Sequence, residues 1–318
     1  MKVFFEKEFI ENFEIEFSDK KYSEPFKLLY TVFTQYPNIE CYTDIEEDLQ
    51  KEAIEGSEIL TKLTDINPRI KHVTDFKVEI LKKSSFQTLV FTAQEKDWFE
   101  ELKELPVLFF SYKRLEEKLS DFIEKNHKKF DLSDEESRFD WKYFDFLYSD
   151  CEILLISDSY IISDKYQQKI KDNLLLLLNK NLNPNKFYKI FIITELSDSN
   201  VREKITYLNS ELAKFRLKIY LINRIKQIEV FDLHDRLLYT NYTVTTSPAG
   251  FNIKSRKLSN SEVITTSIFD EYTYKKQINH IKGIKKYLTN LEMHSQIGSI
   301  IKVIPKKSFK EFHNINFD

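Results

Sequence analysis

Glu152-Ile153-Leu154-Leu155-Ile156-Ser157 carries branched apolar side chains at four successive positions, without polar alternation. Such a run is typical of a strand that is buried on both faces of a sheet. Leucines then recur at helical spacing over residues 165–181, and Asn183-Pro184-Asn185 ends the predicted helix. A second apolar run at 188–194 predicts another buried strand. This order of strand, helix and strand favours an α/β sheet with helices on both faces.

The alternation of strands and helices continues towards the C-terminus. Residues around Leu237, Tyr239 and Val244 alternate with Thr and Asn, which predicts an antiparallel pair. The C-terminal half is therefore predicted to be a mixed sheet flanked by helices. Its other predicted elements are helices at 201–215 and 271–291 and strands at 217–222, 228–233 and 263–268.

The first 150 residues are less regular, and we predict a separate N-terminal α/β domain for them. The aromatic segment 131–150 is predicted to form a helix that packs between the two halves. The predicted domains are thus 1–150 and 151–318. In the N-terminal half we expect helices at 24–35, 44–63 and 112–128 and strands at 76–81, 88–92 and 107–110.

Composition limits the classes of function. A chain of 318 residues is longer than most single domains. Its 48 basic and 51 acidic residues give a net charge of -3, so any surface that attracts nucleic acid must be local. The two cysteines, Cys41 and Cys151, are too far apart for a metal motif and fit a reducing compartment. We predict neither a disulfide framework nor a metal site.

Glycine is rare, with four in the whole chain, and none of them are close together. Phosphate loops of ATPases and dinucleotide-binding enzymes need closely spaced glycines, so we predict no cofactor of these kinds. The N-terminus lacks the pattern of a signal peptide, and no apolar run is long enough to span a membrane. We therefore expect a cytoplasmic protein. The abundance of Lys, Ile, Asn, Phe and Tyr is typical of an AT-rich, bacterial genome.

The segment Phe231–Asn241 brings a histidine and an arginine to one side of a predicted strand. His234 and Arg236 are two residues apart, and Asn241 and Asn252 follow seven and eighteen residues after the histidine. Imidazole, guanidinium and amide groups together suit phosphate, because fixed cationic and neutral donors stabilise charge on its oxygens.

This spacing resembles the His-x-Lys-x4-Asp-x6-Gly-Ser-x-x-Asn motif of the phospholipase D superfamily. His234-Asp235-Arg236 and Gly250-Phe251 are also similar to the phospholipase D-like C-terminal domain of MIT-domain proteins, a non-catalytic branch that binds membranes or partners. The resemblance implies that His234 is nucleophile or acid, that Arg236 holds phosphate and that Asn252 donates to it. It also implies a component of bacterial antiviral defence or of a mobile element.

Three departures from the motif favour binding over catalysis. Arg236 replaces the lysine of the motif and keeps its charge, while Asn241 replaces the aspartate that would orient a histidine. Pro248-Ala249 replaces Gly-Ser and removes a hydroxyl and a backbone donor. Our leading hypothesis is a phosphate- or nucleic-acid-binding protein that uses Arg236, Asn241 and Asn252. The lysines of the locally basic C-terminal region support it: Lys254, Lys257, Lys275, Lys276, Lys282, Lys285 and Lys286.

Three alternatives stay open. The first is a non-enzymatic subunit that binds a protein partner, with His234 structural. The second is a metal-independent phosphodiesterase or nuclease in which a homodimer brings two copies of His234 together. The third is a metal-dependent nuclease in the N-terminal half. Its ligands would be Asp44, Glu46 or Glu79.

Two further positions bear on the site. His127-x-Lys129 also fits the first part of the motif but follows a charged helix, so we interpret it as a chance match. Asp158 follows the first strand of the C-terminal half, where open α/β sheets place their ligands.

Overall fold

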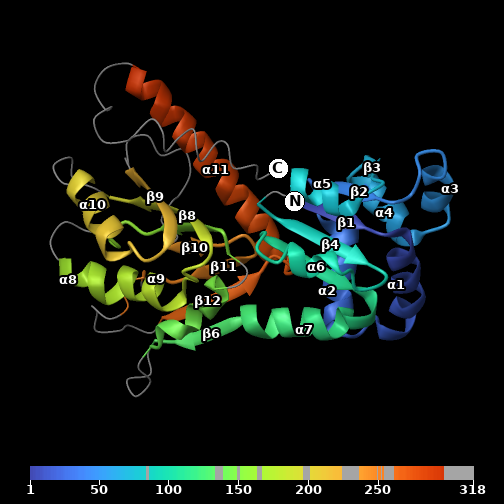
Figure 1. The fold of residues 1–318 in the computed structure, drawn as a ribbon, viewed down its shortest axis with the longest axis horizontal. Helices are drawn as coiled ribbons and strands as arrows, with labels where there is room; N and C mark the ends of the chain where they lie inside the picture. Colours follow the sequence, from blue (N-terminus) through green and yellow to red (C-terminus); the bar gives the residue numbers. More distant parts are fainter. Residues whose placement is uncertain are drawn as a thin grey trace. The chain divides into compact units, whose positions relative to one another are not determined.

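The structure, a computed structural model, describes residues 1–83, 86–132, 139–148, 151–162, 167–195, 201–223, 236–248, 250–251, 253 and 261–296. The chain divides into two compact units, and Figure 1 labels their elements. Among the described residues, Met1–Lys125 and Ile268–Lys275 form the first unit, and Asn126–Ser267 and Lys276–Gln296 form the second. The division thus falls before the boundary that we predicted at residue 150. The predicted α/β class is confirmed, with one parallel and one mixed sheet.

The first unit contains a five-stranded sheet in the order β3-β2-β1-β4-β5, with every neighbouring pair parallel. Its strands are β1 (Lys2–Phe5), β2 (Glu40–Thr43), β3 (Ile70–His72), β4 (Thr88–Thr92) and β5 (Val107–Ser111). Its helices are α1 (Lys7–Lys20), α2 (Glu24–Gln35), α3 (Gln50–Glu55), α4 (Glu58–Ile66), α5 (Phe76–Lys83), α6 (Trp98–Glu101), η1 (Tyr112–Arg114) and α7 (Leu115–Asn126).

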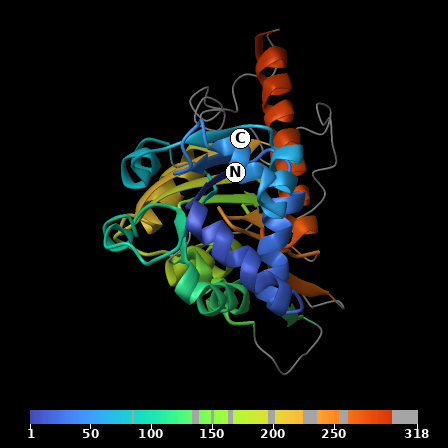
Figure 2. The same cartoon turned by 90° about the vertical axis from the view of Figure 1, so that its right-hand side faces the viewer.

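Successive side chains of the central strand β1 serve opposite faces of this sheet. Phe4 stacks on Tyr42 at 4.5 Å between ring centroids and meets Phe76 of α5 on one face. Phe5 meets Phe33 of α2 on the other face. Helices α1 and α2 lie side by side there, drawn in dark and mid blue in Figure 2, and their Phe13 and Phe26 rings stack. Aromatic packing therefore fills both layers between the helices and the sheet.

The strand that we predicted at 76–81 is wrong, because these residues form α5. Phe76 and Ile80, four residues apart, are both buried, and Glu79 pairs with Lys83 at the same spacing. Asp75 accepts a hydrogen bond from the Val78 amide at 3.1 Å, which caps the helix. Helical spacing and this cap outweigh the apolar composition that suggested a strand.

The second unit contains a seven-stranded sheet in the order β6-β12-β11-β10-β7-β8-β9. Strands β7, β8 and β9 are parallel, and the other neighbouring pairs are antiparallel. The strands are β6 (Lys128–Asp131), β7 (Ile153–Ser157), β8 (Phe187–Thr194), β9 (Arg216–Asn223), β10 (Leu237–Tyr239), β11 (Thr243–Thr246) and β12 (Glu262–Ser267). The helices are η2 (Trp141–Leu147), α8 (Gln167–Ile170), the π-helical turn η3 (Lys171–Leu175), α9 (Leu176–Asn181), α10 (Val201–Glu211) and α11 (Glu271–Gln296).

The aromatic segment that we placed between the two halves belongs to the core of the second unit. Trp141 and Phe144 of η2 are buried in a cluster with Leu154 of β7 and Leu178 of α9. The Asn181 amide donates to the Trp141 carbonyl at 2.8 Å and fixes η2 against α9. This packing explains why residues after 125 join the second unit.

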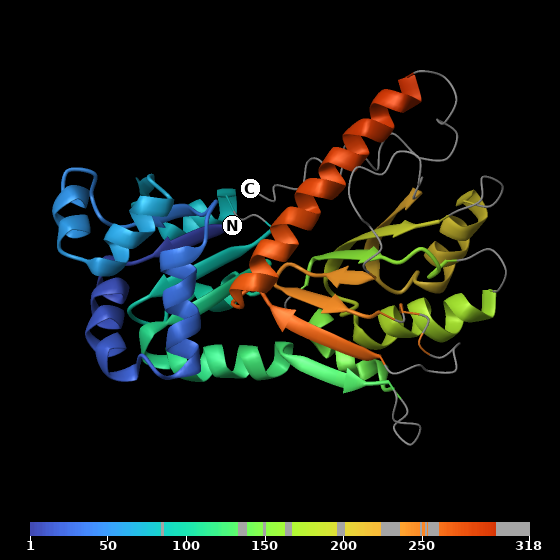
Figure 3. The ribbon, with the colours of Figure 1, turned by 180° about the vertical axis from the view of Figure 1, so that it is seen from behind.

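Helix α11, the long red helix of Figure 3, packs on the opposite face of the sheet through its part in the second unit. The Gln277 amide donates to the Thr240 carbonyl at 2.9 Å, and His280 lies 6.0 Å from the Tyr239 ring. Among the described residues, no helix is long and apolar enough to cross a membrane. The strand predicted at 228–233 lies outside the described residues.

The two cysteines give one thiol to each unit, and both are buried. Burial raises the pKa of Cys41 to about 12. Because the thiolate is the nucleophile, we expect neither thiol to react with Ellman's reagent in the folded protein at about pH 8, and both to react in denaturant. In a Cys41→Ala variant the remaining thiol, Cys151, would then report the unfolding of the second unit. In a Cys151→Ala variant Cys41 would report the unfolding of the first unit. Rapid labelling of native Cys41 would contradict its buried position on β2.

Candidate functional site

The candidate site lies at the carboxyl end of β7 in the second unit. From β7 the parallel strands β8 and β9 extend to one side, and the antiparallel strands begin with β10 on the other side. Such a switch point, at the carboxyl end of a parallel strand, is where open α/β sheets bind ligands. Because β10 is antiparallel to β7, its first residue Leu237 pairs with Ser157 at that end. Arg236 therefore arrives beside Asp158.

Asp158 organises this end of the sheet with a carboxylate that is almost fully buried, at 2% exposure. Its Oδ1 accepts the Tyr160 backbone N–H at 2.9 Å. Its Oδ2 accepts the Phe251 backbone N–H at 2.8 Å. The carboxylate thus ties the turn after β7 to the segment after β11, and charge-assisted hydrogen bonds of this kind are strong.

Gly250 closes the same region in a conformation that suits glycine. Its φ is +80°, and a Cβ there would lie 2.7 Å from Asp158 Oδ2 and 2.9 Å from Arg236 Cδ. The Gly250 N–H donates to the Ser247 carbonyl at 2.7 Å, and the Ser247 hydroxyl donates to the Gly250 carbonyl at 2.7 Å. A side chain at this position would separate Asp158 from Arg236.

The Arg236 guanidinium is held in place by a backbone carbonyl and an aromatic ring. Its Nη1 donates to the Pro248 carbonyl, and its Cζ lies 5.8 Å from the centroid of the Tyr160 ring. No carboxylate in the described part of the chain forms an ion pair with it, and the side chain is partly exposed. The guanidinium carries five N–H donors in a rigid fork that matches phosphate.

Asn241, the third predicted site residue, lies at the other end of β10. Its side chain is fully buried, and its Oδ1 accepts the backbone N–H groups of Glu152 at 2.9 Å and Ile153 at 3.1 Å. Arg236 precedes β10 and Asn241 follows it, so the strand separates them. The structure shows Asn241 holding the beginning of β7. His234 and Asn252 lie outside the described residues.

The parallel sheet of the first unit has a switch point of its own, between β1 and β4. Its order matches the first five strands of the doubly wound order 3-2-1-4-5-6 that binds dinucleotides. At this end of the sheet the Glu6 carboxylate accepts the Ala93 N–H at 2.7 Å and pairs with Lys96 at 2.6 Å. Asp44 accepts the Lys7 N–H at 2.8 Å at the start of α1. Carboxylates of the chain therefore take the positions at which a phosphate would bind.

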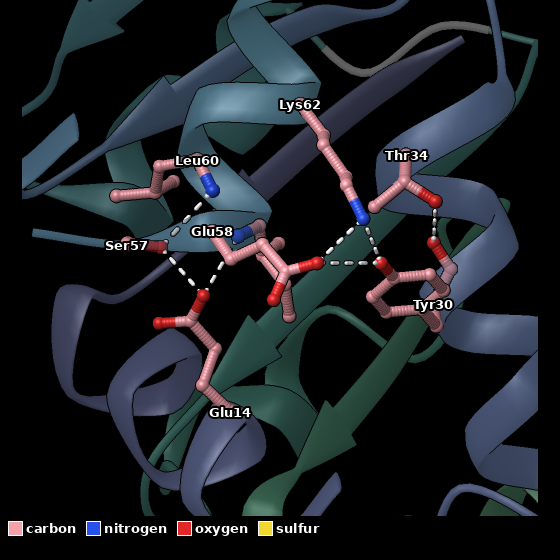
Figure 4. A network of polar contacts seen from close by, with 8 residues as sticks. Glu14, Tyr30, Thr34, Ser57, Glu58, Leu60 and Lys62 are labelled. Carbon is pink, nitrogen blue, oxygen red and sulfur yellow. Dashed lines mark hydrogen bonds and ion pairs between the residues drawn. The ribbon is translucent and has the colours of Figure 1, made fainter. Parts of the chain in front are cut away.

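A polar network on the helices of the first unit serves the start of α4, as Figure 4 shows. The Glu14 carboxylate accepts the Ser57 hydroxyl at 2.9 Å and the Ile59 N–H at 2.7 Å. Ser57 Oγ in turn accepts the Leu60 N–H at 3.0 Å. Two backbone donors at the helix start are satisfied in this way, so the network is a helix cap.

The same close-up shows Lys62 donating to both Glu58 and Tyr30. The hydrogen bond between Lys62 and Glu58 lowers the pKa of Glu58 and raises the pKa of Lys62. A cavity of about 480 Å³ lies beside the cap, and its charged lining residues include Glu11, Glu14 and Glu52. This cavity does not suit an anion.

The described residues contain no cluster of three or more His, Cys, Asp or Glu side chains that could hold a metal. Asp44 binds the start of α1, and Glu79 pairs with Lys83 on α5, so these two predicted metal ligands have separate structural roles. His127, the chance match to the motif, has its Nε2 2.7 Å from the Ser267 hydroxyl. Its position before β6 fits a residue that links this edge strand to β12.

The sequence matches no protein-family model and no curated protein. The function is therefore argued from the geometry of the site. Asp158 was signalled by its place after a buried strand, and Arg236 by its spacing from His234. Gly250 was signalled only as part of the Gly250-Phe251 pair, and Tyr160 carried no local signal, because its importance comes from a contact with a residue far along the chain.

Asn241 provides a test of the buried end of β10. We expect Asn241→Ala to lower the free energy of unfolding of the second unit by about 1–3 kcal/mol, because two buried backbone donors lose their acceptor. Urea unfolding followed by circular dichroism measures the change. Asn185→Ala, at an exposed loop position, is the matched control and should change stability by less than about 0.5 kcal/mol. Equal stability of both variants would contradict the role of Asn241.

Proposed function

We propose that the second unit binds a phosphate group of nucleic acid at the carboxyl end of β7, with Arg236 as the phosphate ligand. The observation that carries the proposal is a preorganised guanidinium at the switch point of the sheet. Arg236 is held by the Pro248 carbonyl and the Tyr160 ring, and among the described residues no carboxylate forms an ion pair with it. A cation that is already oriented loses little side-chain entropy when phosphate binds.

The neighbouring Asp158 is compatible with an anionic ligand. Each of its carboxylate oxygens accepts a backbone N–H, from Tyr160 and Phe251, and the carboxylate is 2% exposed. These donors offset part of its negative charge and hold it away from solvent. Arg236, by contrast, is partly exposed and can reach a ligand.

Lysines on α11 support a polyanion over a single small phosphate ester. Lys282 and Lys286 are exposed and four residues apart, so they lie on one side of the helix. Both belong to the second unit. Additional cations of this kind contribute to nucleic-acid affinity through release of counterions. The likeness to phospholipase D-like domains, the homodimer and the role in bacterial defence stay predictions.

Arg236→Ala tests this proposal. We expect the variant to bind a labelled oligonucleotide more weakly, and the slope of log affinity against log salt to become shallower by about 1, because one phosphate contact is lost. Fluorescence anisotropy between about 50 mM and about 200 mM salt measures both quantities. Arg216→Ala, an exposed arginine on the edge strand β9, is the matched control and should behave as wild type.

Binding that is unchanged in Arg236→Ala, or that is absent at the lowest salt, would overturn the proposal and favour a protein-binding subunit. The same incubation in EDTA separates binding from chemistry. If the wild type cleaves nucleic acid without metal and His234→Ala does not, the protein is a phosphodiesterase and not only a binding protein.

A further inference from the structure

We infer that the nucleic acid bound at this site is single-stranded, with one base stacked on Tyr160. The inference rests on the proposed phosphate site at Arg236. It adds a second group to that site, which recognises the base and so distinguishes a single strand from a duplex.

Tyr160 is an exposed aromatic ring in a defined position. It follows the end of β7, and its backbone N–H is fixed by the Asp158 carboxylate at 2.9 Å. Tyr160 remains 44% exposed, whereas Trp141, Tyr188 and Tyr239 of the same unit are 1%, 0% and 1% exposed. A partly exposed aromatic ring at a ligand site provides a surface on which a base can stack.

The ring lies beside the phosphate ligand of the proposed site. The Arg236 Cζ is 5.8 Å from the Tyr160 centroid, so one nucleotide can meet both a cation and an aromatic surface. Proteins that bind single strands combine these two elements, with cations along the backbone and aromatic rings under the bases. In a duplex the bases are stacked and paired, so their faces are not available to Tyr160.

Tyr148 provides a matched control within the same unit. It is a tyrosine with a similar exposure, 51%, at the end of η2. Its backbone carbonyl lies 3.5 Å from the Tyr188 hydroxyl, while its side chain faces solvent. Tyr148→Ala therefore removes an exposed ring without touching the end of β7.

The experiment compares the affinities of four proteins for four ligands. Wild type, Tyr160→Ala, Tyr160→Phe and Tyr148→Ala are titrated by fluorescence anisotropy with a DNA single strand, an RNA single strand of the same sequence, the matching DNA duplex and a DNA strand that lacks bases. The readout is the ratio of single-strand to duplex affinity. Loss of the Tyr160 ring also removes a contact of Arg236. This effect weakens the binding of single strand and duplex alike, so it cancels in the ratio of their affinities.

We expect Tyr160→Ala to reduce this ratio about tenfold, because stacking on one base is lost. Tyr160→Phe and Tyr148→Ala should keep the wild-type ratio. The affinity of the strand without bases should fall in Tyr160→Ala by no more than the affinity of the duplex does. DNA and RNA that behave alike would support recognition by stacking.

A ratio that is unchanged in Tyr160→Ala, or a strand without bases that binds wild type as well as the normal strand, would overturn the inference. In either case binding that still depends on Arg236 would leave the proposed function standing. Loss of the dependence on Arg236 would refute the proposed function itself.

Discussion

The buried carboxylate of Asp158 is the contact on which the candidate site depends. It joins the turn after β7 to the segment after β11 through the N–H groups of Tyr160 and Phe251. Gly250 passes so close to it that no side chain fits. Because a buried carboxylate without donors would be costly, this arrangement has little freedom. The Tyr160 backbone takes its position from this carboxylate, and the Arg236 guanidinium lies over the Tyr160 ring.

The direction of β10 is the second constraint. A parallel strand at that place would bring its end, not its beginning, to the carboxyl end of β7. The antiparallel pairing of Leu237 with Ser157 delivers Arg236 to the switch point and leaves Asn241 at the opposite end. Of the two predicted site residues next to β10, Arg236 therefore lies at the proposed ligand site and Asn241 has a structural role at the other end of the strand.

The first unit shows that topology alone does not create a binding site. Its sheet has the strand order of nucleotide-binding proteins, yet the Glu6 carboxylate accepts the Ala93 N–H between the ends of β1 and β4. The absence of a glycine-rich loop agrees with this arrangement, because a backbone that carries side chains cannot approach phosphate closely. Substrate chemistry must therefore be argued from side chains and not from the order of strands.

Periodicity and apolar runs in the sequence were sufficient to identify most elements of the second unit, since burial imposes these patterns locally. In the first unit the strands β1, β2 and β3 and the helix α1 were not predicted. Helix 24–35 and strand 88–92 have the predicted bounds. Residues 76–83 form a helix, and this became clear only from the burial of both Phe76 and Ile80, four residues apart. The contact of Arg236 with Tyr160 and the burial of Asn241 could not be inferred in this way. Both join residues more than seventy positions apart, and such proximity exists only after the strands have paired.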